Sequence, residues 1–283
     1  MAVSRRSYLL FALCFAMKKD FLISVICTTY NRPDALSAVL TGLSRQTDSN
    51  FEVVIADDGS TLDTKKVISK FQSQAQFRLL HAWQEDKGFR AAAARNLAFN
   101  RTQGEYILLL DGDCIPSPNW IKNHRCLAER SWSVPGQRIL TSQAFCTEIL
   151  VTDDFVSTLN WSPSHFRELS RKKLVNRWGP SFCFGLHRYS FWRKLSPNNW
   201  KKARSCNWGI WRDDFLTVKG FNESLIGWGH EDADLAIRLM NAGIKFKSGS
   251  FATTVLHLWH KEESRDSANQ NWCVATSNLN NKL

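Results

Sequence analysis

The sequence contains eight cysteines, but no two of them form a Cys-x-x-Cys pair and no dense framework is present. Closely spaced cysteines are typical of small disulfide-rich secreted domains and of zinc sites, so neither class is favoured. A chain of 283 residues with dispersed cysteines is more typical of a reduced, cytoplasmic protein. With 43% hydrophobic residues, the chain can bury a substantial core without disulfides.

Long apolar runs are also missing, and none could cross a bilayer as a helix. The nearest candidate is residues 8–16, which follow Arg5 and Arg6 and resemble the first two parts of a signal peptide. No convincing small-x-small cleavage site follows this stretch. We therefore interpret residues 1–19 as an N-terminal extension, either an upstream addition or a segment that touches a membrane weakly.

Acidic residues are scarce relative to basic ones, with 26 Asp and Glu against 37 Lys and Arg and a net charge of +11. The simplest interpretation of this excess of positive charge is that it keeps the protein soluble. It also suits anionic ligands such as nucleotides, an anionic membrane face or nucleic acid. Zinc-finger spacing and RNA-binding signatures are both absent, so we do not expect a nucleic-acid partner.

Residues 20–130 alternate between apolar runs and helical patterns. The runs at 21–27, 51–56, 77–81 and 106–110 have the length and composition of buried strands. Helical patterns separate them, including residues 33–44 after a well-placed proline and the alanine-rich residues 91–100. Strands that alternate with helices predict an α/β fold with a mostly parallel, Rossmann-like central sheet and helices on both faces.

The pattern changes after about residue 131. Ten of the twelve tryptophans lie at or beyond Trp132, and many segments have no clean period. We predict that residues 131–262 form a smaller mixed half fused to the sheet, with one clear helix at 231–242 that Gly243 ends. Residues 263–283 are polar, and we predict a mobile tail there.

Polar clusters follow three of the predicted strands. They are residues 28–33, residues 57–60 and the sequence Asp111-Gly112-Asp113. Each cluster alone is a weak signal, because Asp-Gly sequences are strong turn formers. Ligands of open α/β sheets bind beyond the carboxyl ends of the strands, so three such clusters predict one crevice suited to a metal-bound diphosphate. The first strand is not followed by Gly-x-Gly-x-x-Gly, which argues against a dinucleotide dehydrogenase.

Two further clusters lie in the second half. Residues 227–234 combine a glycine-hinged loop, one tryptophan and a helix start rich in carboxylates. Acidic groups in a first helical turn are favoured by the helix dipole, so this segment also has a purely structural interpretation. His257 and His260 follow an apolar stretch, and His257 could equally be a satisfied strand residue.

Residues 23–33, 57–60 and 104–113 resemble, in this order, the inverting family-2 glycosyltransferases, whose nucleotide-sugar-binding fold is called GT-A. The resemblance covers residues 20–130 closely. Residues 227–234 look like the Trp-Gly-x-Glu-Asp motif of the galactosyltransferase and chondroitin-polymerase-type transferases, and residues 207–215 are similar to the segment that precedes it. His230 departs from the small residue often found at its position.

This resemblance implies roles for particular residues. Asp232 would be the catalytic base, with Glu231 binding sugar hydroxyls and Trp228 forming a stacking wall. A metal ion, Mn²⁺ or Mg²⁺, would be held by Asp113, His257 and His260, and the nitrogen ligands favour Mn²⁺. The residues expected to bind the nucleotide sugar are Thr28, Tyr30, Arg32, Asp58, Arg90, Asp111, Gly112, Asp113 and Trp228.

The implied activity is metal-dependent, inverting transfer of a sugar from a UDP-sugar to a hydroxyl of a glycan or lipid-linked glycan, as in the synthesis of cell-surface polysaccharide or lipopolysaccharide. We expect a cytoplasmic location, at the inner face of the membrane if a peripheral contact forms. The basic stretch 167–177 and the tryptophans suggest an acceptor groove bordered by positive charge. The alternative is a catalytically inactive nucleotide-binding or scaffold protein on the same fold.

Overall fold

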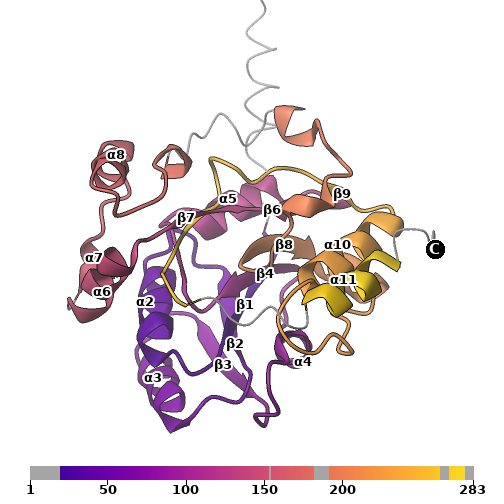
Figure 1. The fold of residues 1–283 in the computed structure, drawn as a ribbon, viewed down its shortest axis with the longest axis horizontal. Coiled ribbons are helices and arrows are strands. Elements are labelled where there is room, and N and C mark those ends of the chain that lie inside the picture. Colours follow the sequence, from indigo (N-terminus) through magenta and orange to yellow (C-terminus); the bar gives the residue numbers. More distant parts are fainter. Residues whose placement is uncertain (1–19, 153, 182–190, 262–267, 278–283) are drawn as a thin grey trace, which may run out of the picture.

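A central sheet of seven strands runs through the computed structural model, which describes residues 20–152, 154–181, 191–261 and 268–277 (Figure 1). The predicted extension at residues 1–19 lies outside these residues. The strand order is β3-β2-β1-β4-β8-β6-β9. The strands are β1 (Ile23–Thr29), β2 (Phe51–Asp57), β3 (Arg78–Trp83), β4 (Tyr106–Asp111), β6 (Trp132–Pro135), β8 (Asn207–Trp211) and β9 (Lys245–Phe246).

The predicted α/β architecture is confirmed. Strands β1 to β4 are parallel, whereas β8 runs antiparallel to both β4 and β6. The sheet therefore continues into the second half of the chain, which contributes three of its strands. A smaller sheet of order β5-β10-β7 contains β5 (Cys114–Pro116), β10 (Thr254–His257) and β7 (Gln137–Leu140).

Helices cover both faces of the central sheet (Figure 1). On one face α2 (Pro33–Ser44) and α3 (Leu62–Gln72) share a core with Val25 and Cys27 of β1. On the other face α4 (Ala91–Phe99) and α10 (Glu231–Asn241) share a core with Ile26. Successive strand residues point to opposite faces, so burial on both sides explains why these strands are continuous apolar runs.

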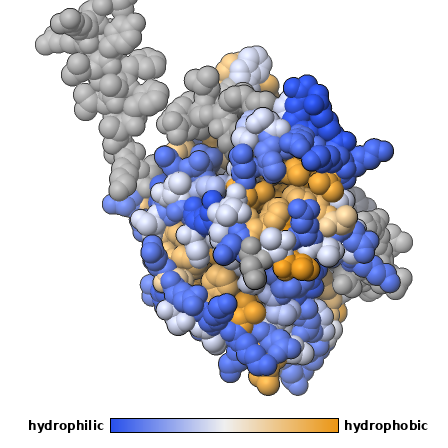
Figure 2. All heavy atoms as spheres, turned by 90° about the vertical axis from the view of Figure 1, so that its left-hand side faces the viewer, coloured by the Kyte–Doolittle hydropathy of each residue, from blue (hydrophilic) through white to orange (hydrophobic). Residues whose placement is uncertain are grey.

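The remaining helices belong mainly to the second half. They are α5 (Trp120–Leu127), α6 (Gln143–Val151), α7 (Phe155–Thr158), α8 (Pro163–Arg171), α9 (Arg212–Thr217), α11 (Ala268–Ser277) and the 3₁₀ turns η1 (Gly179–Ser181), η3 (Phe191–Lys194) and η4 (Trp200–Lys202). Apolar and hydrophilic side chains are mixed on the face that carries α2, α3 and α6 (Figure 2). Within the described ranges, no helix combines the length and apolar character needed to span a bilayer.

Within residues 263–283, for which the sequence predicts a mobile tail, the structure describes the helix α11, which packs against α10. Ala275 is fully buried, and the Asn271 amide donates hydrogen bonds to the carbonyls of Ile226 and Gly229. The buried alanine and the Asn271 amide therefore connect α11 to α10 and to the loop before it.

Candidate active site

The carboxyl ends of β1, β2 and β4 are joined by backbone hydrogen bonds. The Gly112 amide donates to the Thr28 carbonyl at 2.7 Å, and the Asp58 amide donates to the Thr29 carbonyl at 3.1 Å. A Cβ at Gly112 would lie 2.7 Å from the Thr28 oxygen, so only glycine permits this approach. The three polar clusters predicted to share one crevice do meet at this edge of the sheet.

Asp57 and Asp58 have different tasks. Asp57 accepts hydrogen bonds from the Ser60 amide at 2.8 Å and from His81 Nε2 at 2.7 Å, which makes it the turn-forming residue. Asp58 accepts from Gln84 Nε2 and from the Arg90 amide, both at 2.6 Å. Burial raises the pKa of Asp58, and these two hydrogen bonds oppose that rise.

Tyr30 and Arg90, two of the residues predicted to bind the nucleotide sugar, lie beside the end of β2. The Tyr30 hydroxyl donates to Asp86 Oδ2 at 2.9 Å, and its ring is half exposed. The Arg90 guanidinium donates to the Glu85 carbonyl, so Arg90 shapes the loop between β3 and α4 through both its backbone and its side chain.

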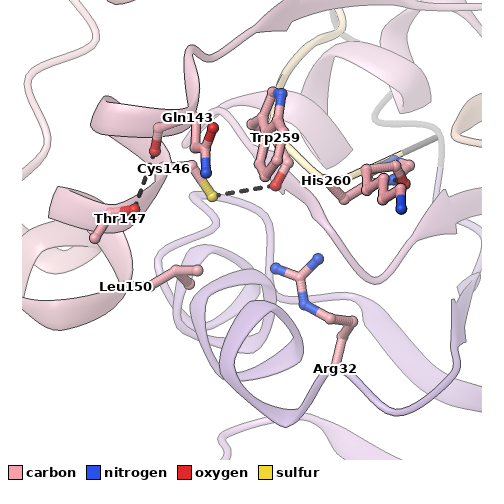
Figure 3. A pocket seen from close by; sticks show the side chains of 8 residues that line it. Arg32, Gln143, Cys146, Thr147, Leu150, Trp259 and His260 are labelled. Atoms are coloured by element: carbon pink, nitrogen blue, oxygen red, sulfur yellow. Dashed lines mark hydrogen bonds between the residues drawn. The ribbon is translucent and has the colours of Figure 1, made fainter.

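Arg32 does not join this group. Its Nε lies 3.0 Å from Asp34 Oδ1, and its side chain lines a separate pocket together with His260 (Figure 3). Thr28, Tyr30 and Asp58 do not line that pocket. The structure therefore places Arg32 beside His260, one of the predicted metal ligands, instead of beside the other predicted nucleotide contacts.

Arg95 is the most connected residue of the site, and sequence reasoning missed it. Its side chain is buried, with Nε 2.9 Å from Thr28 Oγ1, Nη2 3.2 Å from Asp111 Oδ1 and Nη1 3.2 Å from Glu231 Oε1. One guanidinium thus links β1, β4 and the start of α10. The available signal was its position as the single charge in the otherwise uncharged helix 91–99.

Carboxylates outnumber cations around Arg95. Burial raises the pKa of Asp111 to about 7, and the negative charges of Asp113, Asp232 and Glu231 add to the rise while Arg95 opposes it. Burial and the neighbouring Asp232 likewise raise the pKa of Glu231. Asp232 Oδ1 is buried without a hydrogen-bond partner. Such surplus negative charge favours binding of a cation or of hydroxyl donors.

The predicted metal ligands lie together. Nε2 of His260 is 3.4 Å from Asp113 Oδ2, Nε2 of His257 is 3.7 Å from Asp113 Oδ1, and the two rings are 5.2 Å apart. The pairing of β10 with β5 sets His257 opposite Cys114, and the Leu258 amide donates to the Asp113 carbonyl. Burial lowers the pKa of His257, which favours the neutral imidazole that a metal requires.

Cys114 offers an alternative third ligand, because its Sγ lies 3.4 Å from Asp113 Oδ1 and it clusters with His257. Burial raises the pKa of this thiol well above its usual range, so it stays protonated and serves poorly as a ligand. His260 is more accessible and supplies a nitrogen. One carboxylate and two imidazoles form a donor set that fits Mn²⁺.

The loop before α10 adopts backbone conformations that few residues tolerate. Gly227, Gly229 and His230 have φ of 83°, 106° and 72°, and the helix that follows presents Glu231 and Asp232 in its first turn. Asn271 of α11 donates to the Gly229 carbonyl at 3.0 Å. A positive φ at a histidine is strained, and such strain persists where surrounding contacts hold it.

The same loop is joined to the loop between β3 and α4, which carries the predicted nucleotide contact Arg90. The Gly227 amide donates to the Phe89 carbonyl at 3.0 Å, which connects the loop carrying Trp228 to the loop carrying Arg90. On its other side, the ring of His230 packs against the ring of Trp272 of α11, and the two ring centroids are 4.9 Å apart. The contact with Trp272 was not expected, because this tryptophan lies in the segment predicted to be a mobile tail.

This fold and site define the GT-A class of nucleotide-sugar transferases. The family described as glycosyl transferase family 2 matches residues 24–195, more than half of the chain, and the chain belongs to that family. The family described as the N-terminal domain of galactosyltransferase matches residues 187–261, which include both the α10 loop and the histidine pair.

Three curated relatives illustrate the similarity. Hyaluronan synthase of Pasteurella multocida is 29% identical over 85% of this chain and 24% of its own length. Validoxylamine A glucosyltransferase of Streptomyces hygroscopicus subsp. jinggangensis (strain 5008) is 30% identical over 79% of this chain and 52% of its own length. UDP-Glc:alpha-D-GlcNAc-diphosphoundecaprenol beta-1,3-glucosyltransferase WfgD of Escherichia coli is 36% identical over 37% of this chain and 38% of its own length. The chain thus spans only a quarter to a half of these relatives.

Solved structures share the fold at low identity. Residues 1–349 of S. aureus TarS in complex with UDP-GlcNAc align with a TM-score of 0.61 and 17% identity, over 92% of this chain and 67% of that one. The mannosyltransferase PcManGT from Pyrobaculum calidifontis, in complex with GDP-Man and Mn²⁺, aligns with a TM-score of 0.56 and 15% identity, over 91% of this chain and 65% of that one.

Proposed function

We propose that this protein transfers a sugar from a UDP-sugar to a hydroxyl of a glycan or lipid-linked glycan, with a divalent metal ion and with inversion at the anomeric carbon. One observation carries the proposal: Asp111, Glu231 and Asp232 converge on Arg95 at the strand ends, beside the cluster of Asp113 with two histidines. A surplus of carboxylates beside two imidazoles suits a metal-bound diphosphate and a general base in one site.

Asp232 is the proposed base. Its unpartnered Oδ1 can accept the proton of the acceptor hydroxyl as that oxygen bonds to the anomeric carbon and the bond to the diphosphate breaks. Attack from the face opposite the leaving group inverts the configuration. Arg95 holds Glu231 beside Asp232, which leaves Glu231 to position sugar hydroxyls.

Asp113, His257 and His260 are the residues that would hold the metal ion, Mn²⁺ by preference or Mg²⁺. When bound there, the ion would neutralise charge on the departing nucleotide. The complex of a structural neighbour with Mn²⁺ supports this part of the proposal, as the complex of another with UDP-GlcNAc supports UDP as the nucleotide.

The proposal includes contact with an anionic membrane surface, at which lipid-linked acceptors reside. Phe191, Trp192 and Leu195 are each more than 60% exposed on or beside the turn η3, and Lys201 and Lys202 are exposed nearby in sequence. Aromatic side chains and lysines together favour the interface of anionic bilayers. Co-sedimentation with anionic but not zwitterionic vesicles tests this contact.

The test of the activity is a panel of UDP-sugars with Mn²⁺, covering galactose, N-acetylgalactosamine, N-acetylglucosamine and glucuronic acid. We expect one donor to release UDP in the presence of a glycan acceptor, and NMR of the product to show the inverted anomer. Binding of UDP without turnover of any donor would favour the inactive nucleotide-binding alternative.

A further inference from the structure

A pocket of about 240 Å³ lies beside the proposed metal ligand His260 (Figure 3). It is bordered by α6, by the residue before α2 and by the segment after β10. Figure 3 shows the guanidinium of Arg32 pointing toward Cys146 and Trp259. His260 belongs both to this pocket and to the proposed metal site. The lining residues are Arg32, Gln143, Cys146, Thr147, Leu150, Trp259, His260 and Lys261.

The pocket is positively charged. Arg32 and Lys261 line it, and none of the described residues that line it is an aspartate or a glutamate. Asp34 accepts hydrogen bonds from Nε and Nη2 of Arg32, but a guanidinium has five N–H donors, so further donors remain for a ligand. An arginine and a lysine that line one pocket are suited to a phosphate or carboxylate group.

The rest of the lining suits a sugar ring. Trp259 is 41% exposed and offers an aromatic face, while Leu150 and Cys146 supply apolar surface. Gln143 and Thr147 add an amide and a hydroxyl. An aromatic platform with a few polar groups at its edge is the combination that recognises the apolar face and the hydroxyls of a pyranose.

The pocket is also held in shape by contacts between its walls. The Cys146 thiol donates to the Trp259 carbonyl at 3.4 Å, and the Trp259 amide donates to Thr141 Oγ1 at 2.8 Å. Segments more than 100 residues apart in sequence are thereby fixed to each other, so Trp259 is held against the α6 wall of the pocket.

We propose that this pocket is an acceptor subsite for an anionic sugar unit, a pyranose that carries a phosphate or a carboxylate group. Its wall at His260 places such a unit next to the site where the donor diphosphate would lie. The acceptor role rests on the proposed transferase function, whereas binding of an anionic sugar to the pocket does not.

Saturation-transfer NMR with three probes tests the proposal on the full chain without nucleotide. The probes are N-acetylglucosamine 1-phosphate, methyl glucuronide and neutral methyl N-acetylglucosaminide. We expect at least one anionic probe to bind at least about tenfold more tightly than the neutral one, which is a difference of about 1.4 kcal/mol. Preference for the phosphate or for the carboxylate identifies which anionic group the subsite takes.

Matched variants locate the binding. Thr147→Phe fills the pocket from α6, and Glu148→Phe adds the same ring to the neighbouring position of that helix, which does not line the pocket. Lys261→Ala removes a lining cation, and Lys122→Ala removes an exposed cation of α5. Thr147→Phe and Lys261→Ala should each weaken the anionic probe about tenfold, and the two controls should not.

Equal binding of neutral and anionic probes, or equal effects of pocket and control variants, would overturn the proposal. Stabilisation by UDP and Mn²⁺ is measured on the same proteins, and Thr147→Phe and Glu148→Phe should both retain it. If wild type lacks this stabilisation but binds the anionic sugar, the transferase function fails and the anionic-sugar site remains.

Discussion

The carboxylate at the end of β2 and the carboxylates around Arg95 differ in how fully the folded protein supplies them with hydrogen-bond donors. Asp58 accepts two hydrogen bonds of 2.6 Å, so both of its carboxylate oxygens are paired without a ligand. Asp111, Glu231 and Asp232 share one guanidinium, and Asp232 Oδ1 has no hydrogen-bond partner. The end of β2 is therefore pre-formed, whereas the region around Arg95 holds negative charge that a bound cation and substrate would relieve.

The largest expected effect comes from Asp232→Asn. If Asp232 is the base, this change should lower kcat by about 10²–10⁴, the usual contribution of general base catalysis, and leave UDP affinity near the wild-type value. Asp58→Asn is the matched change at the other acid and should weaken UDP binding. Steady-state kinetics and calorimetric titration of UDP separate the two, and loss of nucleotide binding in Asp232→Asn would count against the assignment.

Arg95→Met should lower the free energy of unfolding more than the matched change Arg90→Met. It leaves Asp111 and Glu231 without their cation, and breaking a buried ion pair in this way lowers the free energy of unfolding by about 3–5 kcal/mol. Arg90→Met removes an arginine side chain bonded to a loop carbonyl and should change stability by about 1 kcal/mol or less. Urea unfolding compares them, and equal effects would refute the special position of Arg95.

Asn271→Ala tests whether α11 supports the loop before α10. Loss of hydrogen bonds to the Ile226 and Gly229 carbonyls should lower the free energy of unfolding by about 1–2 kcal/mol and reduce kcat, because the strained loop that positions Asp232 loses its support. Thr276→Ala on the same helix removes only bonds within that helix. An unchanged kcat in Asn271→Ala would limit α11 to a role in stability.

His124 provides the smallest effect and separates structural from site histidines. Burial lowers its pKa to about 3, below the usual value near 6.5. Between pH 6.5 and pH 3, His124 binds a proton in the unfolded chain but not in the folded one, so protonation favours unfolding. The stability associated with the neutral His124 is therefore fully present above pH 6.5 and is lost as the pH falls toward 3. Between pH 6.5 and 5.5, wild type should lose about 1 kcal/mol more than His124→Gln. The same change at His165 is the control, and parallel pH profiles for wild type and His124→Gln would contradict the account.

The strands that carry the site could be predicted because burial on both faces makes them continuous apolar runs, which end where Asp57 and Asp111 begin the polar clusters. Arg95 could not be assigned in the same way. Its partners lie 16 to 136 residues away in sequence, and a charge within an alanine-rich helix has no local signature of pairing. Arg32 was placed with the nucleotide from its position in a motif, but its orientation depends on Asp34 and on the approach of α6.

The second half was harder to predict for a related reason. His257 and His260 are recognisable as a pair, but only the pairing of β10 with β5 brings them to Asp113. The polar composition of α11 concealed its contact with α10. The sequence thus predicts the helices and strands that have a clear local apolar pattern. The rest of the site depends on contacts between residues far apart in the sequence.

The carboxylates and histidines at the strand ends are proposed to bind a metal ion and a nucleoside diphosphate. The most direct measurement is the thermal midpoint of wild type and Asp113→Asn with UDP or GDP, each with and without Mn²⁺. A ligand that binds only the folded protein raises the midpoint. The account predicts stabilisation of wild type by UDP that requires Mn²⁺ and is lost in Asp113→Asn; no stabilisation of wild type by either nucleotide would contradict it.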